Sequence, residues 1–154
     1  MLAARKPEPA AGTNRPTVGK IELALANPEW PGFRGDDRAS RSRGPQILTN
    51  WTAHPPRQLW KTPVGPAWSS FAVAGNLLFT QEQRGPMETV VCYDADTGRE
   101  VWNRQIETRF DEPLGGPGPR ATPTLAKGGL FVTGATGTFL RLTPPRARSF
   151  GNRN

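Results

Sequence analysis

An internal repeat of about 42 residues constrains this chain more than any other feature of its sequence. Leu59-Trp60 precedes Val101-Trp102 by this spacing. The segment SSFAVAGNLLFT (69–80) resembles ATPTLAKGGLFVT (121–133) if one residue is inserted near Lys127, and TVVCYD (89–94) then aligns with TFLRLT (138–143). Four short apolar segments in a unit of this length are typical of a β-propeller blade.

The segments between the turns have the composition of β-strands. RQLWKTPV (57–64), ETVVCYD (88–94) and REVWNRQI (99–106) are rich in β-branched and aromatic residues, and Gly75-Asn76 predicts a hairpin. The chain holds 17 glycines and 17 prolines, which disfavour helix interiors. We therefore predict an all-β fold, a partial β-propeller of about two four-stranded antiparallel blades.

Composition divides the chain into three parts. Residues 1–29 are rich in proline, alanine and charge and predict a flexible leader, residues 30–142 hold the repeats, and residues 143–154 form a basic tail that we expect to be disordered or out of frame. All 13 acidic residues lie at or before Glu112, so the net charge of +7 arises largely in the C-terminal third. Such a tail predicts only weak, salt-sensitive binding to polyanions and no specific nucleic-acid partner.

The stretch CYDADTGREVW (92–102) resembles the A-x-D-x-x-T-G-K-x-x-W signature of the pyrroloquinoline-quinone-like (PQQ-like) repeat family. Asp94, Thr97, Gly98 and Trp102 match at full spacing, whereas Cys92 and an arginine replace two positions of the signature. WPGFRG (30–35), WSSFAV (68–73), GGPGPRATPT (115–124) and GLFVTGATG (129–137) also resemble bacterial members of this family. The family comprises the propellers of quinoprotein dehydrogenases and of the outer-membrane assembly lipoprotein.

The chemistry of the signature residues agrees with a structural role. Asp94 and Thr97 can accept hydrogen bonds from turn amides, and Gly98 can adopt a positive φ. The resemblance implies that Trp102 docks against the adjacent blade. We therefore predict that Asp94, Thr97, Gly98 and Trp102 join blades, and we predict no catalytic, cofactor-binding or metal-binding residue in this chain.

The resemblance implies a non-catalytic scaffold or protein-interaction module of the periplasm or cell envelope, whose partners are other proteins or the missing blades of its own propeller. The alternative is a fragment of a PQQ-dependent dehydrogenase, in which case PQQ and calcium would be cofactors. The sequence contains no run of 18 apolar residues, so we predict no membrane-spanning helix. No apolar segment typical of a signal peptide follows Met1.

Several residue groups suggest other chemistry, and each has a structural interpretation that we favour. Asp94-x-Asp96-x-Gly98 resembles the start of a calcium loop but lacks the later glutamate. GGPGPRATPT lacks the lysine and the helix of a phosphate loop, so we expect its Arg120 to anchor carbonyls or a carboxylate rather than a ligand. We expect a solvated loop at Arg34, Arg38, Arg41 and Arg43, where a phosphate site is the alternative.

The remaining candidates are single side chains. His54 has no partner for a catalytic triad, and Cys92 lies in a strand and is expected to be buried. Glu82 and Glu88 flank a Gly-Pro turn; we expect exposed loop acids, and paired carboxylates are the alternative. Trp30 and Phe33 predict a loop pinned onto a core.

The second repeat stops within its blade, because LTPPRARS (142–149) replaces the expected turn and docking tryptophan. We expect a truncated or frame-shifted member of the family, with a true basic tail as the alternative. Two blades leave open strand edges, so we expect the isolated chain to be marginally stable, oligomeric or prone to aggregation.

Overall fold

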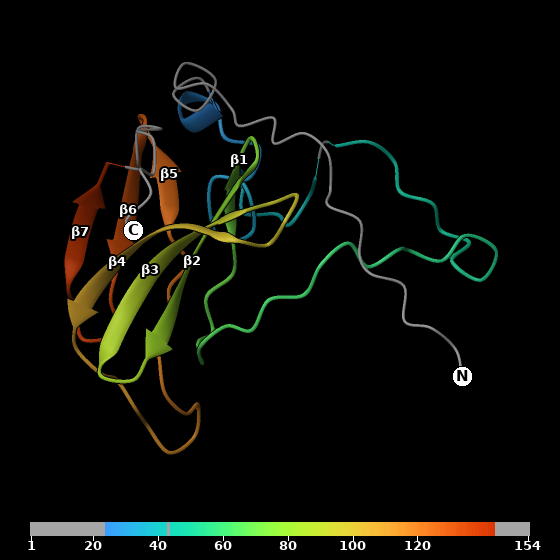
Figure 1. Cartoon of the computed structure of the whole chain (residues 1–154). Coiled ribbons are helices and arrows are strands. Elements are labelled where there is room, and N and C mark those ends of the chain that lie inside the picture. Colours follow the sequence, from blue (N-terminus) through green and yellow to red (C-terminus); the bar gives the residue numbers. More distant parts are fainter. Residues whose placement is uncertain (1–23, 43, 144–154) are drawn as a thin grey trace, which may run out of the picture.

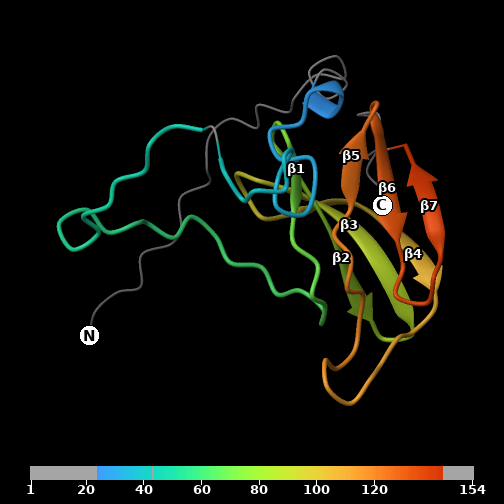
Figure 2. The same ribbon diagram turned by 180° about the vertical axis from the view of Figure 1, so that it is seen from behind.

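Two antiparallel sheets stand side by side in the computed structural model, which describes residues 24–42 and 44–143 (Figures 1 and 2). The first sheet has the order β1-β2-β3-β4 and the second the order β5-β6-β7. The strands are β1 (Ala72–Ala74), β2 (Leu77–Arg84), β3 (Met87–Asp94), β4 (Glu100–Glu107), β5 (Thr124–Ala126), β6 (Gly129–Thr133) and β7 (Phe139–Leu142). Neighbours in sequence are neighbours in each sheet, as in the blades of a propeller, and the fold is a partial β-propeller.

Short turns with residues of positive φ set the register of the first sheet. Gly75 (φ 56°) lies in the two-residue turn between β1 and β2, and Gly85 (φ 57°) lies between β2 and β3. The ladder of β2 and β3 then runs from Leu77↔Asp94 to Arg84↔Met87 without interruption. The predicted hairpin at Gly75-Asn76 is confirmed.

The second sheet repeats the first with one difference from the expected alignment. Both opening hairpins have two-residue turns, Gly75-Asn76 in the first sheet and Lys127-Gly128 in the second. The insertion expected near Lys127 is therefore absent. β5 and β6 follow β1 and β2 at the same offset of 52 positions, from Ala72 to Thr124 and from Leu77 to Gly129. The register places Cys92 opposite Phe79 and Arg141 opposite Phe131, which preserves the expected match of β3 with β7.

A shared hydrophobic core joins the two sheets. One face of the first sheet contributes Phe79, Val90 and Cys92, each fully buried, and the second sheet contributes Leu130 and Val132. Burying side chains of this size stabilises the fold by about 2 kcal/mol each. The stacking of one sheet on the next by large apolar residues is the arrangement that the repeat predicts for adjacent blades.

The predicted strand at 57–64 is wrong, because this segment pairs with no strand among the described residues. In Figure 1 it is part of the green coil that lies to the right of β2 and β3 and leads into β1. Pro63 cannot donate a ladder hydrogen bond. In addition, no strand among the described residues precedes the segment, so there is no earlier sheet that it could extend. The described chain therefore contains one four-stranded blade and one three-stranded blade rather than two of four strands.

Residues 24–29, which were predicted as the end of a flexible leader, pack against the sheets. Leu25, in a short helical turn, is 5% exposed and belongs to the hydrophobic core, and the Glu29 carboxylate accepts a hydrogen bond from the Gly75 amide at 2.7 Å. Residues 1–23 and 144–154 lie outside the described residues, and with them most of the predicted leader and tail. An apolar residue within a polar stretch is thus anchored by the sheet that follows it.

Trp30 and Phe33 differ in their environment. Trp30 forms an isolated bridge with Val73 through two backbone hydrogen bonds, and its ring packs against Gly35. Phe33 is 61% exposed and is not pinned to the core, which corrects that prediction. The backbone turns directly after Phe33, where Arg34 and Gly35 both adopt positive φ.

Candidate functional site

The turn between β3 and β4 is organised around one carboxylate. Asp94 Oδ1 accepts hydrogen bonds from the Thr97 amide at 2.9 Å and the Thr97 hydroxyl at 2.7 Å, and Asp94 Oδ2 accepts one from the Asn76 side chain at 3.0 Å. Gly98 then adopts φ 66° and its amide bonds to the Asp94 carbonyl at 2.8 Å. The turn predicted from the sequence is therefore present, closed by its own side chains.

Trp60 docks on this turn. Its indole Nε1 donates to the Ala95 carbonyl at 2.8 Å, and the Thr62 hydroxyl donates to the Gly98 carbonyl at 2.8 Å. A Cβ added at Gly98 would lie 2.4 Å from the Trp60 ring, so a glycine is required here for close approach as well as for φ. The segment 57–64 is thus held to the first sheet by side chains rather than by a strand ladder.

Trp60 was missed as a site residue by reasoning from the signature alone. The signal was present, because Trp60 precedes Trp102 by the repeat period. Trp102 itself is partly buried and packs beside the core. A docking turn for Trp102, equivalent to the one at Asp94, would have to follow β7, where the sequence reads TPPRARS (143–149).

A second group of polar side chains joins the two sheets. Gln81 Nε2 donates to the Ala121 carbonyl at 2.8 Å, and Glu88 Oε2 accepts the Ala135 amide at 3.1 Å. Both side chains are essentially buried, and Glu88 is fully so. Burial raises the pKa of the Glu88 carboxyl, and the Ala135 hydrogen bond opposes this only in part.

Glu82 lies on the opposite face of the first sheet. Its Oε2 accepts the Gly65 amide at 3.0 Å, and its Oε1 pairs with Arg84, which also bonds Glu100 at 2.8 Å. Tyr93 completes the cluster, and burial followed by the charge of Glu82 raises the pKa of its phenol.

Both glutamates therefore correct the prediction of exposed loop acids, since Glu82 and Glu88 are 2% and 0% exposed. Nor do they form a carboxylate pair. Glu82 is opposite Thr89 and Glu88 is opposite Gln83, so the two side chains point to different faces of the sheet.

Arg120 behaves as predicted from the glycine-rich loop. Its guanidinium donates to the Gly118 carbonyl at 2.8 Å and the Gly116 carbonyl at 2.7 Å, and it pairs with Glu112 at 3.1 Å. It also lies 5.1 Å from the Phe110 ring and 5.8 Å from the Trp68 ring. These contacts hold the loop between the sheets in place, as expected for an arginine that anchors carbonyls and a carboxylate.

The other candidates are dispersed. Cys92 is buried as predicted, and burial together with Asp94 raises its thiol pKa to about 12. His54 is exposed, and so are Arg34, Arg38 and Arg41, as expected for a solvated loop; Arg43 lies outside the described residues. No cluster of three or more His, Cys, Asp or Glu side chains suited to a metal ion occurs within 24–42 and 44–143.

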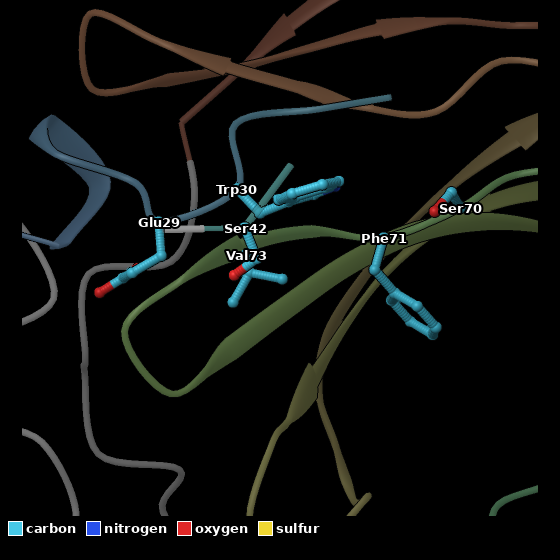
Figure 3. A pocket seen from close by; sticks show the side chains of 6 residues that line it. All are labelled: Glu29, Trp30, Ser42, Ser70, Phe71 and Val73. Carbon is cyan, nitrogen blue, oxygen red and sulfur yellow. The ribbon is translucent and has the colours of Figure 1, made fainter. Parts of the chain in front are cut away.

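A shallow depression of about 480 Å³ lies where the N-terminal segment crosses β1 (Figure 3). It is lined by Glu29, Trp30, Ser42, Ser70, Phe71 and Val73. Figure 3 shows Glu29 and Phe71 pointing in different directions, away from the Trp30 ring. Convergent polar groups, which define most ligand sites, are not found among these residues.

Comparison with known families decides the membership of the chain. The family model described as outer membrane protein assembly factor BamB, a PQQ-like repeat model, matches residues 50–147, more than half of the chain. The chain belongs to the PQQ-like repeat family. No curated protein and no solved structure matches it. The match covers both sheets and the docking segment 57–64, so the geometry described above is that of PQQ-like blades.

Proposed function

We propose that the chain is a non-catalytic part of a PQQ-like propeller that serves as a scaffold in outer-membrane protein assembly. The observation that carries the proposal is that the polar side chains at the blade junctions bond to turns, loops and the neighbouring sheet. Asp94 closes a turn, Glu88 bonds across to the second sheet, and Arg120 holds the connecting loop. The matching family is that of an outer membrane protein assembly factor, which supports a setting in the cell envelope.

The partners we propose are proteins. Large apolar side chains are exposed along the segment that leads into the first sheet, among them Ile47 (73%), Trp51 (56%) and Trp68 (67%). Exposed apolar groups clustered in one segment are typical of protein-binding surfaces. No helix within the described ranges is long and apolar enough to cross a membrane.

A PQQ-dependent dehydrogenase is the competing function, and two observations favour the scaffold over it. PQQ is a multiply charged anion that is bound together with calcium, and it needs free cationic donors and several oxygen ligands. Arg120 is already bonded to Glu112 and two carbonyls, and the described part of the chain offers no cluster of acidic ligands. The absence of a cofactor stays a prediction.

The scaffold role is tested by deleting the gene and measuring the amount of folded β-barrel protein in the outer membrane. We expect a decrease that the wild-type chain restores. A Trp51→Ser variant should fail to restore it, whereas Leu114→Ser should succeed, because Leu114 is 98% exposed on a loop outside the apolar segment. Unchanged outer-membrane proteins after deletion would refute the role.

The enzymatic alternative is tested on the purified chain. PQQ and calcium are added together with an electron-accepting dye and simple alcohols or sugars. We expect no dye reduction and no change in PQQ absorbance. Reduction that requires both PQQ and calcium would replace the scaffold proposal by the dehydrogenase.

A further inference from the structure

The second sheet ends in a strand edge that the first sheet does not have. In the first sheet β3 is covered by β4, whereas among the described residues β7 pairs only with β6. The face of β7 that points away from the first sheet carries Phe139, which is 65% exposed and stacks on Phe131 at 6.2 Å. Within residues 24–42 and 44–143, no further strand covers the backbone edge of β7 or this aromatic face.

The chain also contains the strand type that this edge lacks. Residues 57–64 correspond to β4 by the repeat spacing, yet they have no sheet of their own. Their backbone contains no helix, turn or bend, and Leu59 and Val64 are 67% and 59% exposed. The middle of the segment is fixed to the first sheet through the side chains of Trp60 and Thr62, so its orientation is set.

The two features cannot meet within one copy. Both ribbon views place β7 and the segment 57–64 on opposite sides of the molecule, with the first sheet between them (Figures 1 and 2). Trp60 keeps the segment on the β3–β4 turn of its own first sheet. A second copy of the chain can supply the missing strand without breaking that contact.

We propose that residues 57–64 of one copy add to β7 of another copy as its fourth strand, which joins copies head to tail. This self-association is independent of the function proposed above. The described residues of each copy then contribute two complete blades, β1–β4 and β5–β7 with the donated strand. Propellers contain about four to eight blades, so a closed ring needs about two to four copies.

The register of the first sheet transfers directly to the proposed contact. Val91 is opposite Asn103 and Cys92 is opposite Trp102. The repeat relates these pairs to Leu140 opposite Lys61 and Arg141 opposite Trp60. Pro63 then falls opposite Thr138, just before β7 begins, where its missing amide costs no ladder bond along Phe139–Leu142.

The mass of the intact 154-residue chain is the first test. Light scattering coupled to size exclusion should give a discrete assembly of about two to four chains that dissociates on dilution. Phe139→Glu should yield monomers with an unchanged circular dichroism spectrum, because Phe139 is exposed in the single copy. Leu114→Glu, at an exposed loop position outside the contact, should leave the mass unchanged. A wild-type monomer at high concentration would overturn the proposal.

A cross-link between two single-cysteine variants tests the register. Chains carrying Lys61→Cys are mixed with chains carrying Leu140→Cys and oxidised, and we expect a covalent dimer with one chain of each kind. Opposed residues of an antiparallel pair lie within disulfide range. Cys92 is left in place because it is buried and protonated.

The matched control replaces Leu140→Cys by Thr124→Cys, an exposed position on β5 at the other edge of the second sheet, and should give no mixed dimer. An assembly that forms without the 61–140 cross-link and is insensitive to Phe139→Glu uses another surface and overturns the proposal.

Discussion

At the scale of single residues, Gly98 shows how one position serves two requirements. Its φ of 66° favours glycine, and the Trp60 ring occupies the space in which a Cβ would lie. Gly85 has a similar φ of 57° but nothing within 4 Å of its added Cβ. A side chain at Gly85 would therefore cost backbone strain alone, whereas a side chain at Gly98 would cost backbone strain and a clash with the Trp60 ring.

We expect Gly85→Ala to lower the free energy of unfolding by about 1 kcal/mol, the cost of a left-handed alanine. Gly98→Ala should cost this amount and about 2 kcal/mol more, because the Trp60 ring must move. Urea denaturation followed by tryptophan fluorescence measures both variants. Equal losses would contradict the docking of Trp60 on the turn.

The buried carboxyl of Glu88 predicts a pH dependence of stability. Its pKa is raised in the folded protein, so folding favours the protonated form. The stabilisation is complete below the unfolded pKa, near 4.3, and is lost as the pH rises through the higher folded pKa. Glu88→Gln keeps an acceptor for the Ala135 amide and removes the titration.

We therefore expect Glu88→Gln to be more stable than the wild type at pH 7 and to lose this advantage toward pH 4. Urea titrations at several pH values provide the difference between the two proteins. The Glu112→Gln variant is the control, because the Leu114 amide and then Arg120 lower the pKa of Glu112, which gives a dependence of opposite sign. A difference between wild type and Glu88→Gln that does not change with pH would contradict the burial of the charge.

At the scale of elements, the β3–β4 turn is stabilised by the three hydrogen bonds of one carboxylate. Asp94 bonds Thr97 twice and Asn76 once, whereas Asp96 is exposed and makes no hydrogen bond or ion pair among the described residues. A calcium loop would use both aspartates. The turn requires only one.

We expect Asp94→Ala to destabilise the chain by about 1–2 kcal/mol, the range for a lost capping or turn carboxylate. Asp96→Ala should change stability by less than about 0.5 kcal/mol. Thermal melts of both variants, each with and without calcium, give the comparison. Equal, calcium-dependent losses would favour a metal loop over the blade turn.

The elements also show where local reasoning succeeds. Gly75-Asn76, Gly85-Pro86 and Asp94–Gly98 were predictable as turns, since their conformations depend on residues within a few positions. Residues 57–64 have the composition of a strand and are not one, because a strand requires a neighbour with free backbone groups.

At the scale of the whole molecule, one thiol reports the opening of the core. Cys92 lies between Phe79 and Trp102 in the ladder and is fully buried, with its pKa raised to about 12 by burial and Asp94. A protonated, inaccessible thiol reacts with alkylating agents only after the first sheet opens.

We expect alkylation of Cys92 in the native protein at pH 8 to be at least about 100-fold slower than in urea-unfolded protein. The rate should rise in parallel with the loss of fluorescence as urea is added, if the two sheets unfold together. Mass spectrometry after timed alkylation measures it. Fast labelling under native conditions would mean that the first sheet opens separately from the second.

The sequence by itself determined the all-β class, the blade repeat and the β3–β4 turn around Asp94 and Gly98, because these depend on residues close together in the chain. Only the tertiary structure decided that Glu82 and Glu88 are buried, that Leu25 enters the core and that Trp60 docks on Gly98. Those outcomes depend on which surfaces meet across 17 to 47 positions of sequence, as in the Gly65–Glu82 and Glu88–Ala135 hydrogen bonds. Burial and charge pairing are properties of the packed sheets, and no local pattern contains them.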